Sequence, residues 1–137
     1  MPTTAYSIEL KPNPFDQYCI SAGFKVGDLI FLSGHVAIDE AGIPIKGGFD
    51  VQANVTFENL ERSLQNAGSS LDKIIKVTIY LTNMKQHRPK IIELRKKWFN
   101  PPYPADTLVE VSALGDPSRL IEIEAIALSD GRVARQA

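Results

Sequence analysis

Three short groups of residues in this sequence have side chains that could do chemistry. Ser33-Gly34-His35 ends an apolar run, and a hydroxyl near an imidazole suggests a nucleophile with its base. Neighbouring residues of a strand point apart, however, so a turn that closes a buried strand is the alternative. Glu122 and Glu124 are two residues apart and share one face of a strand, where burial would raise a pKa and solvation would leave both carboxylates ordinary. Asp106 follows a proline-rich break, where it caps a turn or acts as an acid.

A fourth group is cationic. It comprises Lys85, His87, Arg88, Lys90, Arg95, Lys96 and Lys97. Such a cluster attracts an anion or forms the solvated face of a helix. The sequence has no phosphate-binding glycine loop and no clustered metal ligands, so no metal and no cofactor is expected. Tyr18 and Cys19 lie in a possible strand, and Cys19, without a predicted activating neighbour, is expected to be buried and inert.

Periodic apolar residues predict the elements that position these groups. Residues 28–33 indicate a buried strand, and residues 50–67 a helix that Gly68 ends. The helical stripe is Ala53, Phe57, Leu60, Leu64 and Ala67. Residues 74–81 alternate as a strand does, with one face formed by Ile75, Val77, Ile79 and Leu81.

The second half of the chain predicts one more helix and two more strands. The helix covers about 89–99, with Pro89 in its first turn, and residues 100–104 are irregular because prolines interrupt them. The strands cover 108–114 and 120–128, and residues 130–137 form a loose tail.

The predicted order is β-β-β-α-β-α-β-β. It indicates a single α+β domain over residues 1–137, with two layers in which both helices cover one face of a mixed sheet. The other face still carries apolar side chains such as Leu29 and Phe31, which favours an oligomer that hides them.

Composition excludes several classes of protein. The 137 residues include 15 Lys and Arg against 16 Asp and Glu, a net charge of −1 that does not suit binding to nucleic acid. A single cysteine excludes a disulfide framework. No apolar run is long enough to span a membrane and no signal peptide precedes the chain, so a cytoplasmic protein is expected.

Several segments together resemble one family. They are VGDLIFLSG at 26–34, ENL at 58–60, AGSSLD at 67–72, KVTIYLTNM at 76–84, LVEV at 108–111 and IEIEAIA at 121–127. In this order and spacing they are similar to the Rid superfamily, the reactive-intermediate or imine deaminases also called the YjgF family. The resemblance covers about residues 20–128. It implies a chorismate-mutase-like fold and a homotrimer with a barrel-like core, whose clefts between subunits bind a small imine or enamine.

The resemblance also assigns site residues, of which this chain retains two. Ser33 matches the family serine, and Glu122 matches the glutamate that handles the attacking water. The carboxylate-binding arginine of the motif Pro-Ala-Arg is replaced by Asp106. The remaining substrate-binding positions also differ: His35 stands for a glutamine, Ile92 for an asparagine and Ile20 for a tyrosine, unless Tyr18 takes that place with a two-residue shift.

These departures leave two functions open. Asp106, which stands at the position of the family arginine, would repel the carboxylate of a ligand, unless Arg88, Arg95 or Arg119 reaches that ligand. The chain is then a divergent hydrolase of small C=N compounds, in which Glu122 handles water and Asp106 binds a polar or cationic group. The alternative is a trimer that binds a metabolite without turnover. Ribonuclease activity is a third and weaker hypothesis, because phosphates need neutralising charge.

Overall fold

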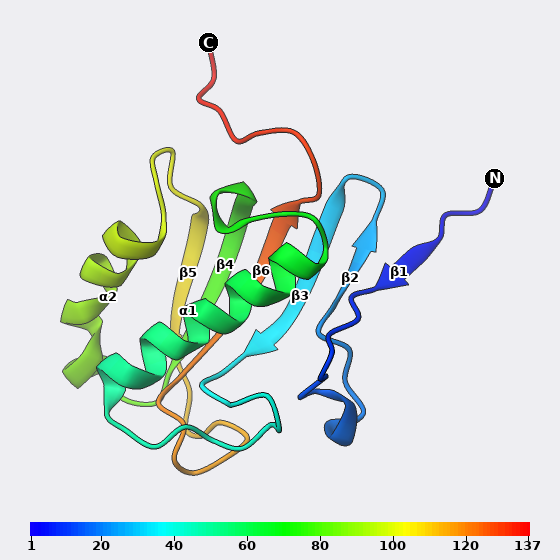
Figure 1. Cartoon of the computed structure of the whole chain (residues 1–137). Coiled ribbons are helices and arrows are strands. Elements are labelled where there is room, and N and C mark those ends of the chain that lie inside the picture. The colour runs from blue at the N-terminus through cyan, green and yellow to red at the C-terminus, as the bar shows by residue number, and fades with distance from the viewer.

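A computed structural model describes residues 1–137 and contains six strands and two α-helices (Figure 1). In chain order these are β1 (Ala5–Ser7), β2 (Gly23–Val26), β3 (Leu29–His35), α1 (Phe49–Asn66), β4 (Ile74–Leu81), α2 (Met84–Trp98), β5 (Ala105–Glu110) and β6 (Ile121–Leu128). Two short 3-10 helices, η1 (Asp16–Tyr18) and η2 (Leu71–Lys73), lie between them. The predicted order of strands and helices is confirmed.

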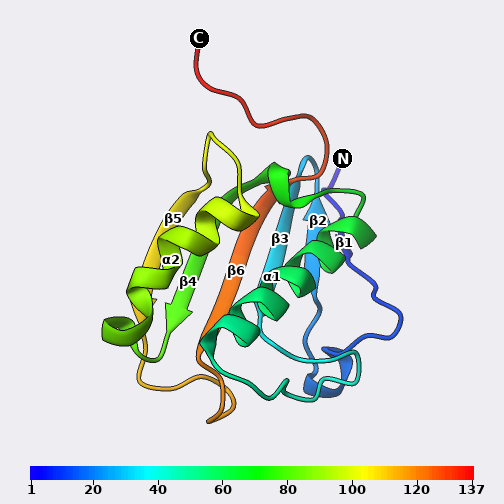
Figure 2. The same ribbon diagram turned by 60° about the vertical axis from the view of Figure 1, so that its left-hand side comes forward.

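All six strands form one sheet in the order β1-β2-β3-β6-β4-β5. The β4–β5 pair is parallel and every other pair is antiparallel, so the sheet is mixed as predicted. Both helices lie against the same face of the sheet (Figure 2). The opposite face has no helix over it, and Phe24 and Phe31 pair across neighbouring strands there, each 42% exposed.

Helix α1 follows the predicted pattern. Its apolar stripe packs into the core between the helices and the sheet, where Ala53, Phe57, Leu60 and Leu64 are almost fully buried. Gly68 follows the helix with φ +78°, and the Ser69 N–H donates to the Leu64 carbonyl at 2.8 Å. This is a Schellman ending, in which glycine relieves the strain of positive φ, so the prediction for Gly68 is confirmed.

Helix α2 begins five residues earlier than predicted. The Asn83 side chain accepts a hydrogen bond from the Gln86 N–H and caps the helix, so Pro89 lies inside it rather than in its first turn. Pro89 therefore supplies no N–H for the Lys85 carbonyl. Strand β5 was also misplaced, because its parallel pairing with β4 starts at Ala105, directly after the proline-rich break, and ends at Glu110.

Two local predictions are wrong. A register shift in the β4–β6 pair lies between Ile74 and Lys76, and as a result Ile74 rather than Ile75 joins the core. Tyr18 lies in η1 and Cys19 follows it with φ 59°, so neither is in a strand, and Cys19 is exposed rather than buried. No helix in the chain combines the length and the apolar character needed to cross a membrane.

Candidate functional site

A cleft of about 550 Å³ lies where β3 and β6 meet the segment after β1 and the loop before β6. We call it the Glu122 cleft. Its lining residues are Phe15, Tyr18, Ile20, Ser33, Gly34, Val36, Ile38, Pro44, Gly115, Asp116, Arg119 and Glu122. Three of the residues predicted for the site, namely Ser33, Ile20 and Glu122, are therefore brought together here.

Glu122 is the half-buried carboxylate of this cleft. It alternates with the buried Ile121 and Ile123 of β6 and so lies on the face of the sheet opposite the helices. Burial is the main cause of the raised pKa of Glu122; the nearby Arg119 charge lowers this pKa, and the Glu124 charge raises it. A Cβ atom on Gly34 would lie 2.5 Å from Glu122 Oε2, which means that the carboxylate occupies space that only glycine leaves free.

Glu124 shares this face with Glu122, as the two-residue spacing predicts, but it is exposed and has its own partner. The Tyr80 hydroxyl donates to Glu124 Oε1 at 2.9 Å, and this bond is the main reason why the pKa of Tyr80 is raised. The two glutamates therefore differ in environment, since Glu124 is held by a phenol and Glu122 faces the cleft.

Ser33 and His35 do not form a nucleophile and base. The Ser33 hydroxyl donates to the Ser21 carbonyl at 2.6 Å, whereas His35 Nδ1 donates to the Ser33 backbone carbonyl at 2.6 Å. His35 Nε2 then accepts from the Ser63 hydroxyl at 2.7 Å, which fixes the tautomer. His35 is fully buried and lines no cleft, and the strand continues through it rather than closing in a turn.

The rim of the cleft joins segments far apart in sequence. The Tyr18 hydroxyl donates to the Gly42 carbonyl at 3.1 Å, and the Gln17 amide donates to the Ala41 carbonyl at 2.7 Å. Ile20 lies beside them and is 49% exposed. Both Tyr18 and Ile20 line the cleft, so the tyrosine and the isoleucine share this rim.

Sequence analysis missed the residue that positions the loop before β6. Gln52 of α1 is buried, donates to the Ser118 carbonyl at 2.9 Å and accepts from the Leu120 N–H at 2.9 Å. These two bonds hold the backbone on both sides of Arg119. Asn59 of α1 similarly donates to the Val36 and Ile38 carbonyls at the end of β3.

A sequence signal for these polar residues exists. Gln52, Thr56, Asn59 and Ser63 repeat with the same spacing as the apolar stripe of α1, one position earlier, and all four are buried. A polar stripe directly beside an apolar one indicates side chains that hydrogen-bond to loops at the edge of the core.

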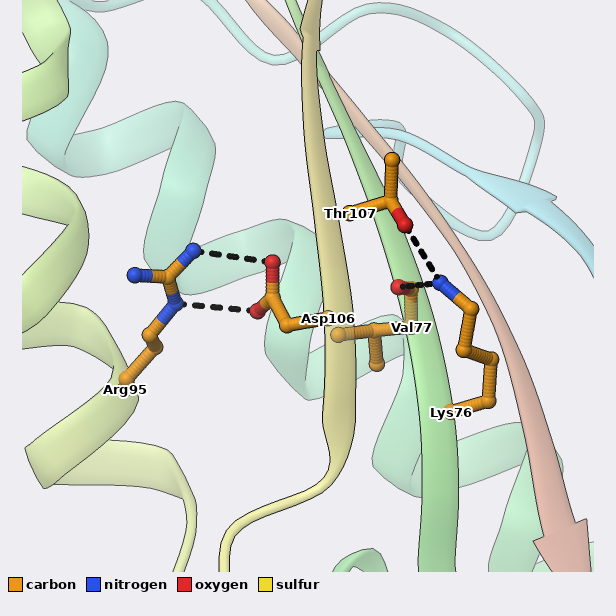
Figure 3. A network of polar contacts seen from close by, with 5 residues as sticks. All are labelled: Lys76, Val77, Arg95, Asp106 and Thr107. Carbon is orange, nitrogen blue, oxygen red and sulfur yellow. Dashed lines mark hydrogen bonds and ion pairs between the residues drawn. The ribbon is translucent and has the colours of Figure 1, made fainter.

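Asp106 and Ile92 lie elsewhere, in a groove of about 830 Å³ between α2 and β5. We call it the α2–β5 groove. Arg95 Nε and Nη2 donate to the two Asp106 oxygens at 2.9 and 2.8 Å, a bidentate ion pair (Figure 3). Thr107, on the other side of β5, accepts from Lys76 Nζ at 2.9 Å (Figure 3). Within one chain Asp106 is therefore on the opposite face of the sheet from Glu122.

The basic residues of α2 divide between several roles. Lys85, Arg88 and Arg95 line the α2–β5 groove. His87 is buried and stacks on Phe49 with ring centroids 4.1 Å apart, and burial lowers its pKa. The predicted cluster is thus neither a uniform solvated face nor a single anion site.

The fold and the cleft define a class: a two-layer α+β chain with a glutamate cleft on the open face of its sheet. The sequence profile of the family described as Endoribonuclease L-PSP matches residues 9–129. A RutC family protein of Pyrococcus abyssi is 38% identical over 89% of this chain and 94% of its own length. A 2-iminobutanoate/2-iminopropanoate deaminase of Dermatophagoides farinae is 29% identical over 91% of this chain and 95% of its own.

A solved structure agrees with this similarity. The crystal structure of RidA from the Antarctic bacterium Psychrobacter superposes with a TM-score of 0.81 at 30% identity, covering 89% of this chain and 98% of that one. The chain belongs to the Endoribonuclease L-PSP family, the Rid superfamily that its motifs resemble, and has the chorismate-mutase-like fold of that family.

Proposed function

We propose that this chain binds a small metabolite in the Glu122 cleft and hydrolyses a C=N bond there. The observation that carries the proposal is the placement of Glu122, a half-buried carboxylate that faces a cleft and has no hydrogen-bond partner within the chain. A carboxylate with a raised pKa is a better proton acceptor than an ordinary glutamate and can take a proton from water.

The reaction balances with this one group and water. Glu122 accepts a proton from water while the oxygen bonds to the imine carbon, and the C=N electron pair moves to nitrogen, which takes up a proton. That proton comes from Glu122, which then accepts the proton of the new hydroxyl and passes it to nitrogen as the C–N bond breaks, so that ammonia leaves, a carbonyl compound remains and Glu122 is again a carboxylate. The Ser33 hydroxyl donates to Ser21 and keeps lone pairs that can accept from a ligand N–H.

We also propose that three copies of the chain complete the site. Asp106 and Ile92 are family site positions in the α2–β5 groove, whereas Ser33, Ile20 and Glu122 line the Glu122 cleft. A trimer built on the open sheet face would bring the groove of one copy to the cleft of the next. His35 donates to the Ser33 carbonyl and is absent from the cleft lining, which supports a role for His35 in positioning the Ser33 backbone rather than in contacting the ligand.

Hydrolysis is tested with 2-imino acids that an amino-acid oxidase generates from acidic, neutral and basic amino acids. We expect the wild-type chain to accelerate the decay of at least one imine, and Glu122→Gln to abolish this acceleration. Glu124→Gln is the matched control, since it removes a second carboxylate from the same strand face and should keep most of the activity. Equal loss in both variants would contradict a specific role for Glu122.

A metabolite-binding trimer without turnover is the second candidate. The ion pair between Asp106 and Arg95 favours it, because the family arginine position is occupied by an acid that is already neutralised within its own chain. Ligand binding with no acceleration of any imine would support this candidate. Cleavage of RNA that is lost in Glu122→Gln would instead favour the activity in the family description, against the net charge of −1.

A further inference from the structure

Arg119 is the cation of the Glu122 cleft, and its charge has no partner. The chain forms two ion pairs, Lys90–Asp50 and Arg95–Asp106, and Arg119 takes part in neither. Its Nε atom is buried and has no hydrogen-bond acceptor. A buried N–H of a charged group without an acceptor is costly, so this arrangement favours an acceptor supplied from outside the chain.

The acidic residues of the cleft do not satisfy Arg119. The Asp116 carboxylate accepts from the Ser118 N–H at 2.9 Å and from the Ser118 hydroxyl at 2.5 Å, and it is therefore held within its own turn. Glu122 forms no ion pair with Arg119, although the two charges are close enough for Arg119 to lower the pKa of Glu122.

The position of the Arg119 side chain is set by the space beside Gly115 and by a fixed backbone. A Cβ atom on Gly115 would lie 2.9 Å from Arg119 Nη1, so the guanidinium occupies space that a side chain would fill. Gln52 fixes the backbone before and after Arg119 through Ser118 and Leu120. Glu122 and Arg119 are thus positioned in the same way, since Glu122 lies against Gly34 as Arg119 lies against Gly115.

Arg95 and Arg88 are placed less well than Arg119 to bind an anion in the Glu122 cleft. Arg95 directs two of its N–H groups to Asp106, and its charge is neutralised there. Arg88 lines the α2–β5 groove rather than the Glu122 cleft. Among the residues that line the Glu122 cleft, Arg119 is the one basic residue.

We propose that Arg119 binds an anionic carboxylate group of the ligand, with the reacting carbon directed toward Glu122. This inference rests on the proposed function, and it assigns to Arg119 the recognition of the charged end of the ligand. Loss of the arginine from position 106 then moves carboxylate recognition to the loop before β6 instead of removing it. A planar guanidinium suits this role because it can donate two parallel hydrogen bonds to a carboxylate.

The test measures binding without turnover. The probes are 2-oxobutanoate, which has the form of a hydrolysis product, and its neutral methyl ester, both titrated by calorimetry. We expect the wild-type chain to prefer the acid, and Arg119→Gln to weaken acid binding by about tenfold or more while the ester is unaffected. Arg119→Lys should restore part of the affinity, and Arg135→Gln, in the exposed tail, is the matched charge control.

The outcomes separate this inference from the proposed function. Arg119-dependent binding of the acid without hydrolysis of any imine would support the inference and contradict the proposed function. Hydrolysis that persists with no preference for the acid, or with a preference that Arg119→Gln leaves intact, would overturn the inference alone. Loss of acid binding in Arg88→Gln but not in Arg119→Gln would also overturn it, as would failure of the wild-type chain to bind the acid. A thermal melt of each variant checks that it is folded.

Discussion

At the scale of single residues, Glu122 lies between two charges of opposite sign that are both close in sequence. Arg119 lowers its pKa and Glu124 raises it, while burial provides the main upward shift. Period-two alternation predicted that Glu122 and Glu124 share a face. The same reasoning could not place Arg119, because the loop that carries it is positioned by Gln52, a residue 67 positions earlier in the chain.

Removing either neighbouring charge should shift the pKa of Glu122, and the two shifts should have opposite directions. Arg119→Gln removes a charge that favours the carboxylate, so the pKa of Glu122 should rise. Glu124→Gln removes a like charge, and the pKa should fall. The side-chain carbon of Glu122, followed by NMR between about pH 3 and pH 8, reports both directly; the other titratable side chains lining the cleft are Tyr18 and Asp116. Shifts of the same sign in both variants would show that the charges do not act as described.

Gly34 gives a second prediction at this scale. Gly34→Ala should displace the Glu122 carboxylate, because the new methyl group would lie 2.5 Å from Oε2. We expect imine hydrolysis to fall by about tenfold or more. The free energy of unfolding should change by less than about 1 kcal/mol, because the clashing atom ends a flexible side chain. Gly48→Ala, which adds a methyl group in open space, serves as the control, and equal losses in both variants would contradict the role of Gly34.

At the scale of elements, the Asp106–Arg95 pair attaches α2 to the edge strand β5. The side chains are 16% and 30% exposed and the pair is bidentate. The family resemblance assigned Asp106 to the substrate-binding residues together with Glu122, whereas within one chain Asp106 lines the α2–β5 groove and not the Glu122 cleft. Strand phase decides which face a residue occupies, and the parallel pairing of Val77 with Asp106 places Asp106 on the side of the helices.

This pair should stabilise the chain more than an exposed pair does. We expect Asp106→Asn to lower the free energy of unfolding by about 1–2 kcal/mol, because a half-buried guanidinium loses its charged acceptor. Asp50→Asn, which breaks the Lys90–Asp50 pair with side chains 44% and 67% exposed, should cost less than about 0.5 kcal/mol. Urea unfolding measures both variants, and equal costs would show that the Asp106–Arg95 geometry adds nothing.

At the scale of the whole molecule, the residues that the family resemblance assigns to the site are divided between two places on one chain. The cleft and the groove lie on opposite faces of the sheet, and the open face carries Phe24 and Phe31. Sequence alternation predicted this apolar face correctly. It could not show that the site positions separate, since that depends on how strands far apart in sequence are ordered in the sheet.

The proposed trimer would account for both the divided site and the apolar open face, and its mass can be measured. We expect analytical ultracentrifugation to give three times the mass of the chain, and Phe31→Glu to reduce it to that of a single folded chain. Val51→Glu is the matched control, because Val51 is 46% exposed against 42% for Phe31 but belongs to helix α1. A monomeric wild type, or a Phe31→Glu variant that remains trimeric, would contradict the proposed assembly.

The buried His35 ring makes the fold sensitive to acid. Burial lowers the pKa of His35 from 6.5 to about 4, and the unfolded chain therefore takes up a proton at this residue well before the folded chain does. The contribution of the neutral ring is complete above pH 6.5 and declines by about 3 kcal/mol as the pH falls toward 4. A ring that is absent from the lining of the Glu122 cleft is thereby expected to limit how acidic a solution the cleft can tolerate before the chain unfolds.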